Sequence, residues 1–196
     1  IEKLKKVVEP RPGEEIFGMT TIVSKGKTIL VADTNVQDFP SAQRLANVSK
    51  SCVRVARLFG FDPKVAFLSH STFGKPVSKN TKHVRDAIEL LKTKNVDFDF
   101  DGEMQPDVAL NPIYQEIYPF SKIVGKANIL MMPALHSAAI STKLMKSFGG
   151  AKLIGPLLIG LGLPIEVAPL RSSTSDILNL ASIAAFSSDV IDYEKN

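Results

Sequence analysis

The side chains best suited to bind a ligand gather in two polar stretches of the sequence. One of them offers three hydroxyl groups, a histidine and a glycine: Ser69, His70, Ser71, Thr72 and Gly74. Hydroxyl groups beside a glycine can meet the oxygens of a phosphate group. The same composition is typical of a loop that caps a helix, and the residue types alone favour this structural interpretation.

The second stretch is acidic and contains Asp101, Glu103 and Asp107, which we expect in one loop after a strand. Grouped carboxylates can bind a metal or transfer protons. They can equally cap the next helix, and Pro106 beside them is typical of a rigid connection. The residues leave these two alternatives open. The three histidines of the sequence lack the spacing of metal ligands, so no metal site is expected from them.

Two further motifs favour structural roles. Gly155, Gly160 and Gly162 match neither a P-loop nor a dinucleotide-binding fingerprint, and we expect them in a crowded turn of the core. Ser173 and Asp176 have the spacing of a capping box, in which two side chains close the start of a helix. This role would by itself explain Asp176.

Strands and helices alternate along the chain and must position these motifs. Strands are expected at residues 19–24, 28–32, 64–68, 96–100 and 128–132, and helices at 41–60, 79–94, 136–148 and 176–186. The alternation predicts parallel βαβ units, and therefore an α/β fold with a mostly parallel sheet. Ligands bind such sheets at the carboxyl ends of the strands, where both polar stretches and the segment Asp33–Asn35 fall.

Two of the helices allow more specific predictions. The helix at 41–60 has one apolar face with Cys52 on it, so we expect Cys52 in the core and not as a nucleophile. Ser41 is expected to cap its start. From Asp176 to Phe186, by contrast, nearly every residue is apolar or small. Such a helix must be covered on more than one side, so we expect it to dock on another domain or a second subunit.

The bulk composition excludes several classes of function. The 24 basic and 20 acidic residues give a net charge of only +4, and the basic residues are scattered, so nucleic-acid binding is not indicated. A single cysteine allows no internal disulfide and favours a cytoplasmic setting. No apolar run is long enough to span a membrane. Because the first residue is Ile1 and not methionine, we expect a fragment of a longer protein or a processed chain.

Several segments, taken in order, resemble the phosphate acetyl/butyryltransferase family. They are residues 30–34 (LVADT), 63–69 (PKVAFLS), 101–110 (DGEMQPDVAL), 125–133 (GKANILMMP) and Gly155-Pro156. The resemblance implies a phosphotransacetylase-like fold, which is a three-layer αβα arrangement of two lobes with the first lobe incomplete. Residues 1–17 would be a linker and partial first-lobe segment, residues 18–155 an αβα lobe, and residues 156–196 a C-terminal segment that returns to the first lobe.

Three segments also look like the appended C-terminal domain of multidomain, NADP-dependent malic enzymes: residues 69–74 (SHSTFG), 101–104 (DGEM) and 133–143 (PALHSAAISTK). In those proteins an N-terminal part oxidatively decarboxylates malate with NADP and a divalent metal. The resemblance implies a regulatory, oligomerising domain without a cofactor of its own, with acetyl-CoA as an allosteric effector. Homodimers or higher oligomers and the malic enzyme domains of the same chain are the implied partners.

This sequence departs from the transferase pattern where acetyl transfer takes place. The family serine and arginine fall on Pro169 and Leu170, and a second family arginine falls on Ser147, so only the aspartate survives, as Asp176. Holding a phosphate dianion and activating a thiol require cations and a base. Arg171 supplies a cation only after a register shift. The resemblance therefore implies lost acetyl transfer, with an active transferase or a purely structural dimerisation domain as alternatives.

Overall fold

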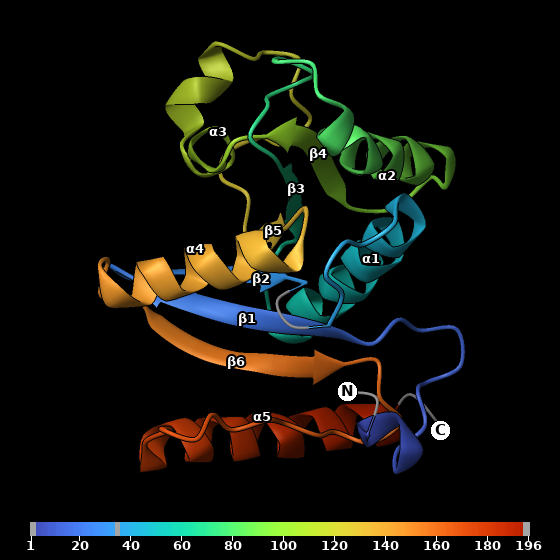
Figure 1. Cartoon of the computed structure of the whole chain (residues 1–196), viewed down its shortest axis with the longest axis vertical. Helices are drawn as coiled ribbons and strands as arrows, with labels where there is room; N and C mark the ends of the chain where they lie inside the picture. The colour runs from blue at the N-terminus through green and yellow to red at the C-terminus, as the bar shows by residue number, and fades with distance from the viewer. Residues whose placement is uncertain (1–2, 34–35, 194–196) are drawn as a thin grey trace.

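A computed structural model describes residues 3–33 and 36–193 of the chain. Its centre is a six-stranded sheet with the strand order β4-β3-β5-β2-β1-β6 (Figure 1). The strands are β1 (Phe17–Ser24), β2 (Lys27–Ala32), β3 (Lys64–Leu68), β4 (Asp99–Met104), β5 (Ile129–Met131) and β6 (Lys152–Ile159). β4, β3, β5 and β2 run parallel, whereas β1 is antiparallel to both of its neighbours. The predicted α/β fold with a mostly parallel sheet is thus confirmed.

Helices cover both faces of this sheet. They are α1 (Ala42–Leu58), α2 (Lys82–Thr93), α3 (Pro106–Leu110), α4 (Leu135–Ser147) and α5 (Thr174–Tyr193), with short 3₁₀ helices η1 (Leu4–Lys6), η2 (Lys79–Thr81) and η3 (Pro112–Glu116). α1, α2 and α5 pack on one face, and α3 and α4 pack on the other. Figure 1 shows α4 and α5 on opposite sides of the β1–β6 edge. This is the three-layer arrangement that the family resemblance implied.

Local signals in the sequence placed several elements correctly. β1 and β2 form a hairpin in which Ser24 pairs with Lys27, and the positive φ angles of Lys25 and Gly26 suit the two-residue turn between them. At the start of α1, the Ser41 hydroxyl accepts a hydrogen bond from the Arg44 amide at 3.2 Å, as predicted.

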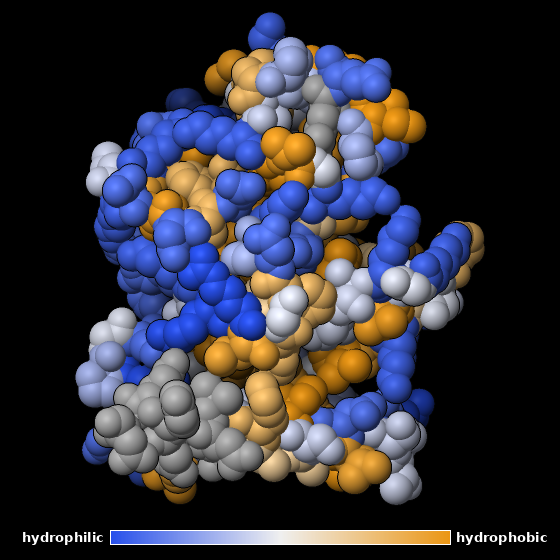
Figure 2. Space-filling model, turned by 180° about the vertical axis from the view of Figure 1, so that it is seen from behind, coloured by the Kyte–Doolittle hydropathy of each residue, from blue (hydrophilic) through white to orange (hydrophobic). Residues whose placement is uncertain are grey.

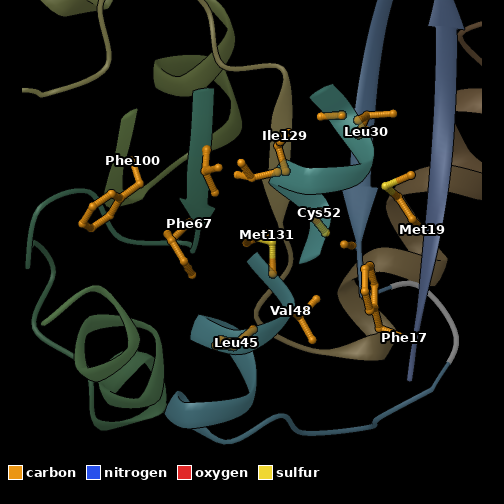
Figure 3. Packing of buried hydrophobic residues seen from close by; sticks show 14 of the residues in the cluster. Phe17, Met19, Leu30, Leu45, Val48, Cys52, Phe67, Phe100, Ile129 and Met131 are labelled. Atoms are coloured by element: carbon orange, nitrogen blue, oxygen red, sulfur yellow. The ribbon is translucent and has the colours of Figure 1, made fainter. Parts of the chain in front are cut away.

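Cys52 lies in the core between α1 and the sheet, among Met19, Ile129 and Met131 (Figure 3). Its side chain is fully buried, and this burial raises the pKa of the thiol well above its ordinary value. A thiol that stays protonated in an apolar core is a poor nucleophile. The prediction that Cys52 is a core residue is confirmed.

The acidic stretch was predicted wrongly as a loop. β4 extends through it, so that Asp101 pairs with Ala66 and Gly102 with Phe67 of β3, while only Asp107 lies beyond the strand, in α3. The polar side chains suggested a loop, but parallel pairing with β3 satisfies the backbone hydrogen bonds of this segment and keeps it in the strand. β4 therefore starts later and ends later than the expected strand at 96–100.

The prediction of a core turn is wrong for Gly155, which lies within β6, whereas Gly160 and Gly162 lie in bends after the strand. Crowding is nevertheless the reason for glycine there. A Cβ atom at Gly155 would lie 2.9 Å from the Met19 carbonyl oxygen, and one at Gly160 would lie 2.2 Å from the Glu15 carbonyl oxygen. Pro156 is tolerated because β6 lies at the edge of the sheet. β6 also runs across residues 155 and 156, where the resemblance places the return to the first lobe; the division into lobes stays a prediction.

The rest of the described chain covers α5 on one side. Leu180 is buried and Ile183 is partly buried against the α1 side of the sheet, and Phe186 stacks on Phe59 with ring centroids 6.1 Å apart. Ile177 and Leu178 instead expose 52% and 66% of their surfaces. The apolar composition of this helix thus exceeds what the described part of the chain buries. None of the helices in that part is long and apolar enough to cross a membrane.

Candidate functional site

The structure separates the predicted site residues into two groups. Ser69, Ser71, Thr72 and Glu103 come together near the carboxyl ends of β3 and β4, the end of the sheet where both polar stretches were predicted. Arg171 and Asp176 lie elsewhere, beside the edge strand β6 and the start of α5. Of the third candidate segment, Thr34 and Asn35 lie outside the described residues. Asp33 is buried and accepts hydrogen bonds from the Gly18 amide at 2.9 Å and from Arg44 at 3.0 Å.

The first group forms a buried hydrogen-bond network. The Ser71 hydroxyl donates to Glu103 Oε1 at 2.7 Å, and Arg85 donates to the same oxygen at 3.0 Å. The Ser69 and Ser71 hydroxyl oxygens lie 3.1 Å apart. Arg85, on α2, was missed by sequence reasoning, because a single arginine on a helix gives no signal of the carboxylate it will meet. These polar groups bind one another and so hold the loop after β3.

The remaining members of the polar stretches also have structural partners. The Asp101 carboxylate accepts the amides of Gly102 at 2.9 Å and Lys122 at 2.7 Å, and Asp107 accepts that of Val108 at 3.0 Å in the first turn of α3. His70 is exposed. No group of histidine, cysteine and acidic side chains within the described ranges can hold a metal ion. Asp107 is thus an acidic residue in the first turn of α3, whose N-cap is Gln105 without a side-chain cap hydrogen bond. A ligand at this end of the sheet stays a prediction.

The second group lines a cleft of about 420 Å³ between the end of α4 and the start of α5. Three cationic side chains line it: Lys143 and Lys146 of α4, and Arg171 of the connection between β6 and α5. Asp176 contributes the one carboxylate among the lining residues that the structure describes. In Figure 2 this side of the molecule is hollowed, and apolar atoms show between hydrophilic side chains. An excess of positive charge in a concave site favours an anionic ligand.

Local structure explains how each charged group reaches the cleft. Lys143 and Lys146 are three residues apart on one helix, so both face the same side. Asp176 forms the predicted capping box: it accepts the Ser173 hydroxyl at 2.8 Å and the Ser173 amide at 3.0 Å. The hydrogen bonds from Ser173, together with the nearby Lys146 and Lys152, hold the pKa of Asp176 below its ordinary value.

The positions that depart from the transferase pattern have different locations. Pro169 lines the cleft and offers no hydrogen-bond donor, while Leu170 is fully exposed to solvent. Ser147 is exposed and is not among the lining residues. Lys143 and Lys146 were not predicted as site residues, although Lys143 ends a segment that carries the resemblance. The cleft can hold an anion, but its wall lacks the serine and the arginine of the transferase pattern.

The mixed sheet between two helical layers and the cationic cleft at its edge define an α/β domain with a candidate anion-binding site. A family model described as phosphate acetyl/butaryl transferase matches residues 1–185. This chain belongs to that family.

Known relatives come from two kinds of protein. The chain is 43% identical to the NADP-dependent malic enzyme of Rhizobium meliloti over 186 residues, which are 95% of this chain and 24% of the malic enzyme. It is 31% identical to the phosphate acetyltransferase of Bacillus subtilis over 92% of this chain and 56% of that enzyme. A phosphotransacetylase from Streptococcus pyogenes matches its fold with a TM-score of 0.86 and 33% identity, over 93% of this chain and 56% of that structure. The chain thus spans about a quarter of the malic enzymes and over half of the transferases.

Proposed function

We propose that this chain is a regulatory domain of an NADP-dependent malic enzyme that binds acetyl-CoA as an allosteric effector and does not transfer acetyl groups. One observation carries the proposal: the cleft holds Lys143, Lys146 and Arg171 but has Pro169 where the transferase pattern has serine. The similarity to malic enzymes over 95% of the chain supports the choice of parent enzyme. Malate oxidation itself, with NADP and a divalent metal, is assigned to the other domains of that enzyme, in a cytoplasmic setting.

The charge of the cleft suits the proposed effector. Acetyl-CoA carries several phosphate groups, and lysine and arginine form strong, charge-assisted hydrogen bonds with phosphate oxygens. Acyl transfer has a further requirement, which is a group that activates the thiol of coenzyme A. Pro169 and Leu170 cannot do this, and the carboxylate of Asp176 is engaged by Ser173. Binding without transfer is therefore the function that these residues support best.

The exposed face of α5 suggests how effector binding in the cleft could change the activity of the malic enzyme domains. Ile177 and Leu178 of α5 are exposed beside the cleft, and we propose that this face docks on the malic enzyme domains of the same protein. A ligand in a cleft at a domain contact can change the affinity of that contact, and this coupling is what an allosteric effector requires. We also propose that the chain associates with itself, as a homodimer or a larger oligomer.

Equilibrium binding of acetyl-CoA to the chain tests the proposal. Arg171→Ala and Lys146→Ala are each expected to weaken binding about tenfold, since each removes one cation from the cleft. Lys79→Ala, at an exposed position of η2, is the matched control and should leave the affinity unchanged. Absence of binding by the wild-type chain would contradict the proposal and favour a purely structural domain.

A transferase assay decides the other alternative. With acetyl phosphate and coenzyme A, the chain is expected to form acetyl-CoA no faster than the reaction without protein. Clear transfer that disappears in Arg171→Ala would show instead that Arg171 replaces the missing arginine and that the domain is an active transferase.

A further inference from the structure

An apolar cavity lies beside β6, where α5 and the end of α1 pack on the same face of the sheet (Figure 1). Within the described residues, it shares none of its lining with the cationic cleft. Its volume is about 60 Å³. One water molecule needs roughly 10–15 Å³ of such a cavity, and a methylene group is similar in size, so about four carbon atoms fit. Most of the wall is apolar and comes from Val55, Phe59, Leu157, Leu161, Ile183 and Phe186. The cavity therefore suits a short aliphatic chain.

Arg54, on α1, brings hydrogen-bond donors to this cavity. One of its terminal nitrogens lies 2.7 Å from the Glu14 carboxylate, and the described part of the chain offers it no other partner. A guanidinium group has five N–H donors, so most of those of Arg54 stay available. Arg11 also lines the cavity, where its Nε donates to the Leu161 carbonyl oxygen at 3.1 Å and a terminal nitrogen lies 3.8 Å from Glu14. Guanidinium groups beside an apolar cavity favour a ligand with an anionic group.

Glu166, in the segment after β6, is a carboxyl group in the lining of the same cavity. Its Oε2 accepts the Leu158 amide at 3.3 Å, and its Oε1 has no hydrogen-bond partner among the residues that the structure describes. Burial raises the pKa of Glu166 to about 7, against the effect of this hydrogen bond. Below that pH the carboxyl group is mostly protonated and can donate a hydrogen bond. Arg54 and protonated Glu166 line one small cavity, so both can donate to the same carboxylate ligand.

We propose that this cavity binds a small aliphatic monocarboxylate, with its chain among the apolar side chains and its carboxylate between Arg54 and Glu166. Other classes of ligand suit these residues less well. A cationic amine would face the guanidinium groups of Arg11 and Arg54, and an alcohol would bring no charge to them. A dicarboxylate would have to place its second charge among apolar side chains. The inference does not depend on the effector proposed above, because the two sites use different residues.

Calorimetric titration of the 196-residue chain with straight-chain carboxylates at about pH 6 tests the class of ligand. Each carbon added up to the four-carbon tail of pentanoate should raise the affinity about fourfold, and longer tails should add little because the cavity is then full. Pentylamine and pentanol should bind at least about tenfold more weakly than pentanoate, since neither offers Arg54 a negative charge. Affinity that keeps rising to octanoate, or pentylamine that binds as well as pentanoate, would overturn the proposal.

Substitutions show whether pentanoate binds in this cavity. Arg54→Met should weaken its binding at least about tenfold. Arg57→Met is the matched control on the same helix, outside the lining, and should leave the affinity unchanged. Ile183→Phe fills the cavity and should abolish binding, and circular dichroism shows whether this variant is folded. Arg171→Ala, in the cationic cleft, should leave pentanoate binding unchanged even where it weakens that of acetyl-CoA. Full affinity in Arg54→Met, or a loss in Arg171→Ala instead, would overturn the site.

The pH dependence of binding tests the part played by Glu166. Among the charged residues in and beside the lining, Arg11 and Arg54 stay protonated throughout, and Glu14 lies against both of them. Because the protonated fraction of Glu166 falls from about nine-tenths at pH 6 to about one-tenth at pH 8, pentanoate should bind about tenfold more weakly at the higher pH. Glu166→Gln keeps a donor that does not titrate, so its affinity should be the same at both pH values. A wild-type affinity that stays constant or rises with pH would contradict the proposed contact.

Discussion

Asp176 accepts two hydrogen bonds from Ser173, one from its hydroxyl at 2.8 Å and one from its amide at 3.0 Å, while Ser173 in return accepts the Asp176 amide at 3.2 Å. The aspartate that the transferase pattern shares with this chain is thus engaged in closing the first turn of α5. A carboxylate at this position also interacts favourably with the positive end of the helix dipole. A residue retained from a catalytic pattern has a structural role here.

The first prediction follows from this capping box. Asp176→Ala should destabilise the chain at neutral pH, because the cap is lost. The folded-state pKa of Asp176 lies below its ordinary value of 3.8, so its contribution is present above that pH and is lost as the pH falls through the lower folded pKa. Urea unfolding at several acidic pH values measures this. The difference between wild type and variant should shrink on acidification, whereas Asp62→Ala, at another exposed aspartate, should show no such trend.

The second prediction concerns Glu166, a half-buried carboxylate beside an apolar cavity lined by Leu161, Ile183 and Phe186. Burial raises the pKa of Glu166 to about 7, against the hydrogen bond from the Leu158 amide. Because the folded pKa is raised, the stabilisation is complete below about 4.5 and is lost as the pH rises towards 7.

Wild-type stability should therefore fall by about 2 kcal/mol over this range, a magnitude reduced for the partial solvent exposure of the group. Glu166→Gln should flatten the profile, while Glu89→Gln, at an exposed glutamate of α2, should leave it unchanged. Equal slopes for the wild-type chain and Glu166→Gln in denaturant titrations between pH 4.5 and 7 would refute the assignment.

The third prediction tests the network around Glu103, whose side chain is 1% exposed while that of Arg85 is 34% exposed. Arg85→Ala removes the cation and leaves a buried carboxylate, so the free energy of unfolding should drop by about 2–3 kcal/mol. The double variant with Glu103→Gln should be less destabilised than the sum of the two single variants, since the unpaired charge is gone. Strict additivity in chemical denaturation would mean that the two residues are not coupled.

The fourth prediction compares two glycines with positive φ. At Gly160 φ is +91° and an added Cβ would lie 2.2 Å from the Glu15 carbonyl oxygen, whereas at Gly26 φ is +72° and the space is open. Gly26→Ala should therefore cost about 1 kcal/mol for backbone strain alone. Gly160→Ala should cost clearly more, because the backbone of the segment before β1 must also move. Thermal unfolding of both variants measures the difference, and equal losses would show that the chain after β6 is not confined by this contact.

The sequence by itself determined the features that depend on neighbouring residues. The apolar spacing around Cys52 predicted α1, Lys25-Gly26 predicted the hairpin, and the spacing of Ser173 and Asp176 predicted the cap of α5. Each of these rests on hydrogen bonds or side-chain periodicity within a few residues, so a short segment contains the whole signal. The order of five short segments between residues 30 and 156 was likewise sufficient to indicate the family.

Tertiary structure alone decided where distant segments meet. β4 continues through Asp101 and Glu103 because β3 pairs with it, and Arg85 finds Glu103 only because α2 packs over that strand. In the same way, the side chains of Lys143 and Arg171 line one cleft because α4 and the segment before α5 lie on either side of β6. Such contacts form only when the helices pack on the sheet. They join residues that are far apart in the chain, so no local pattern of residues predicts them.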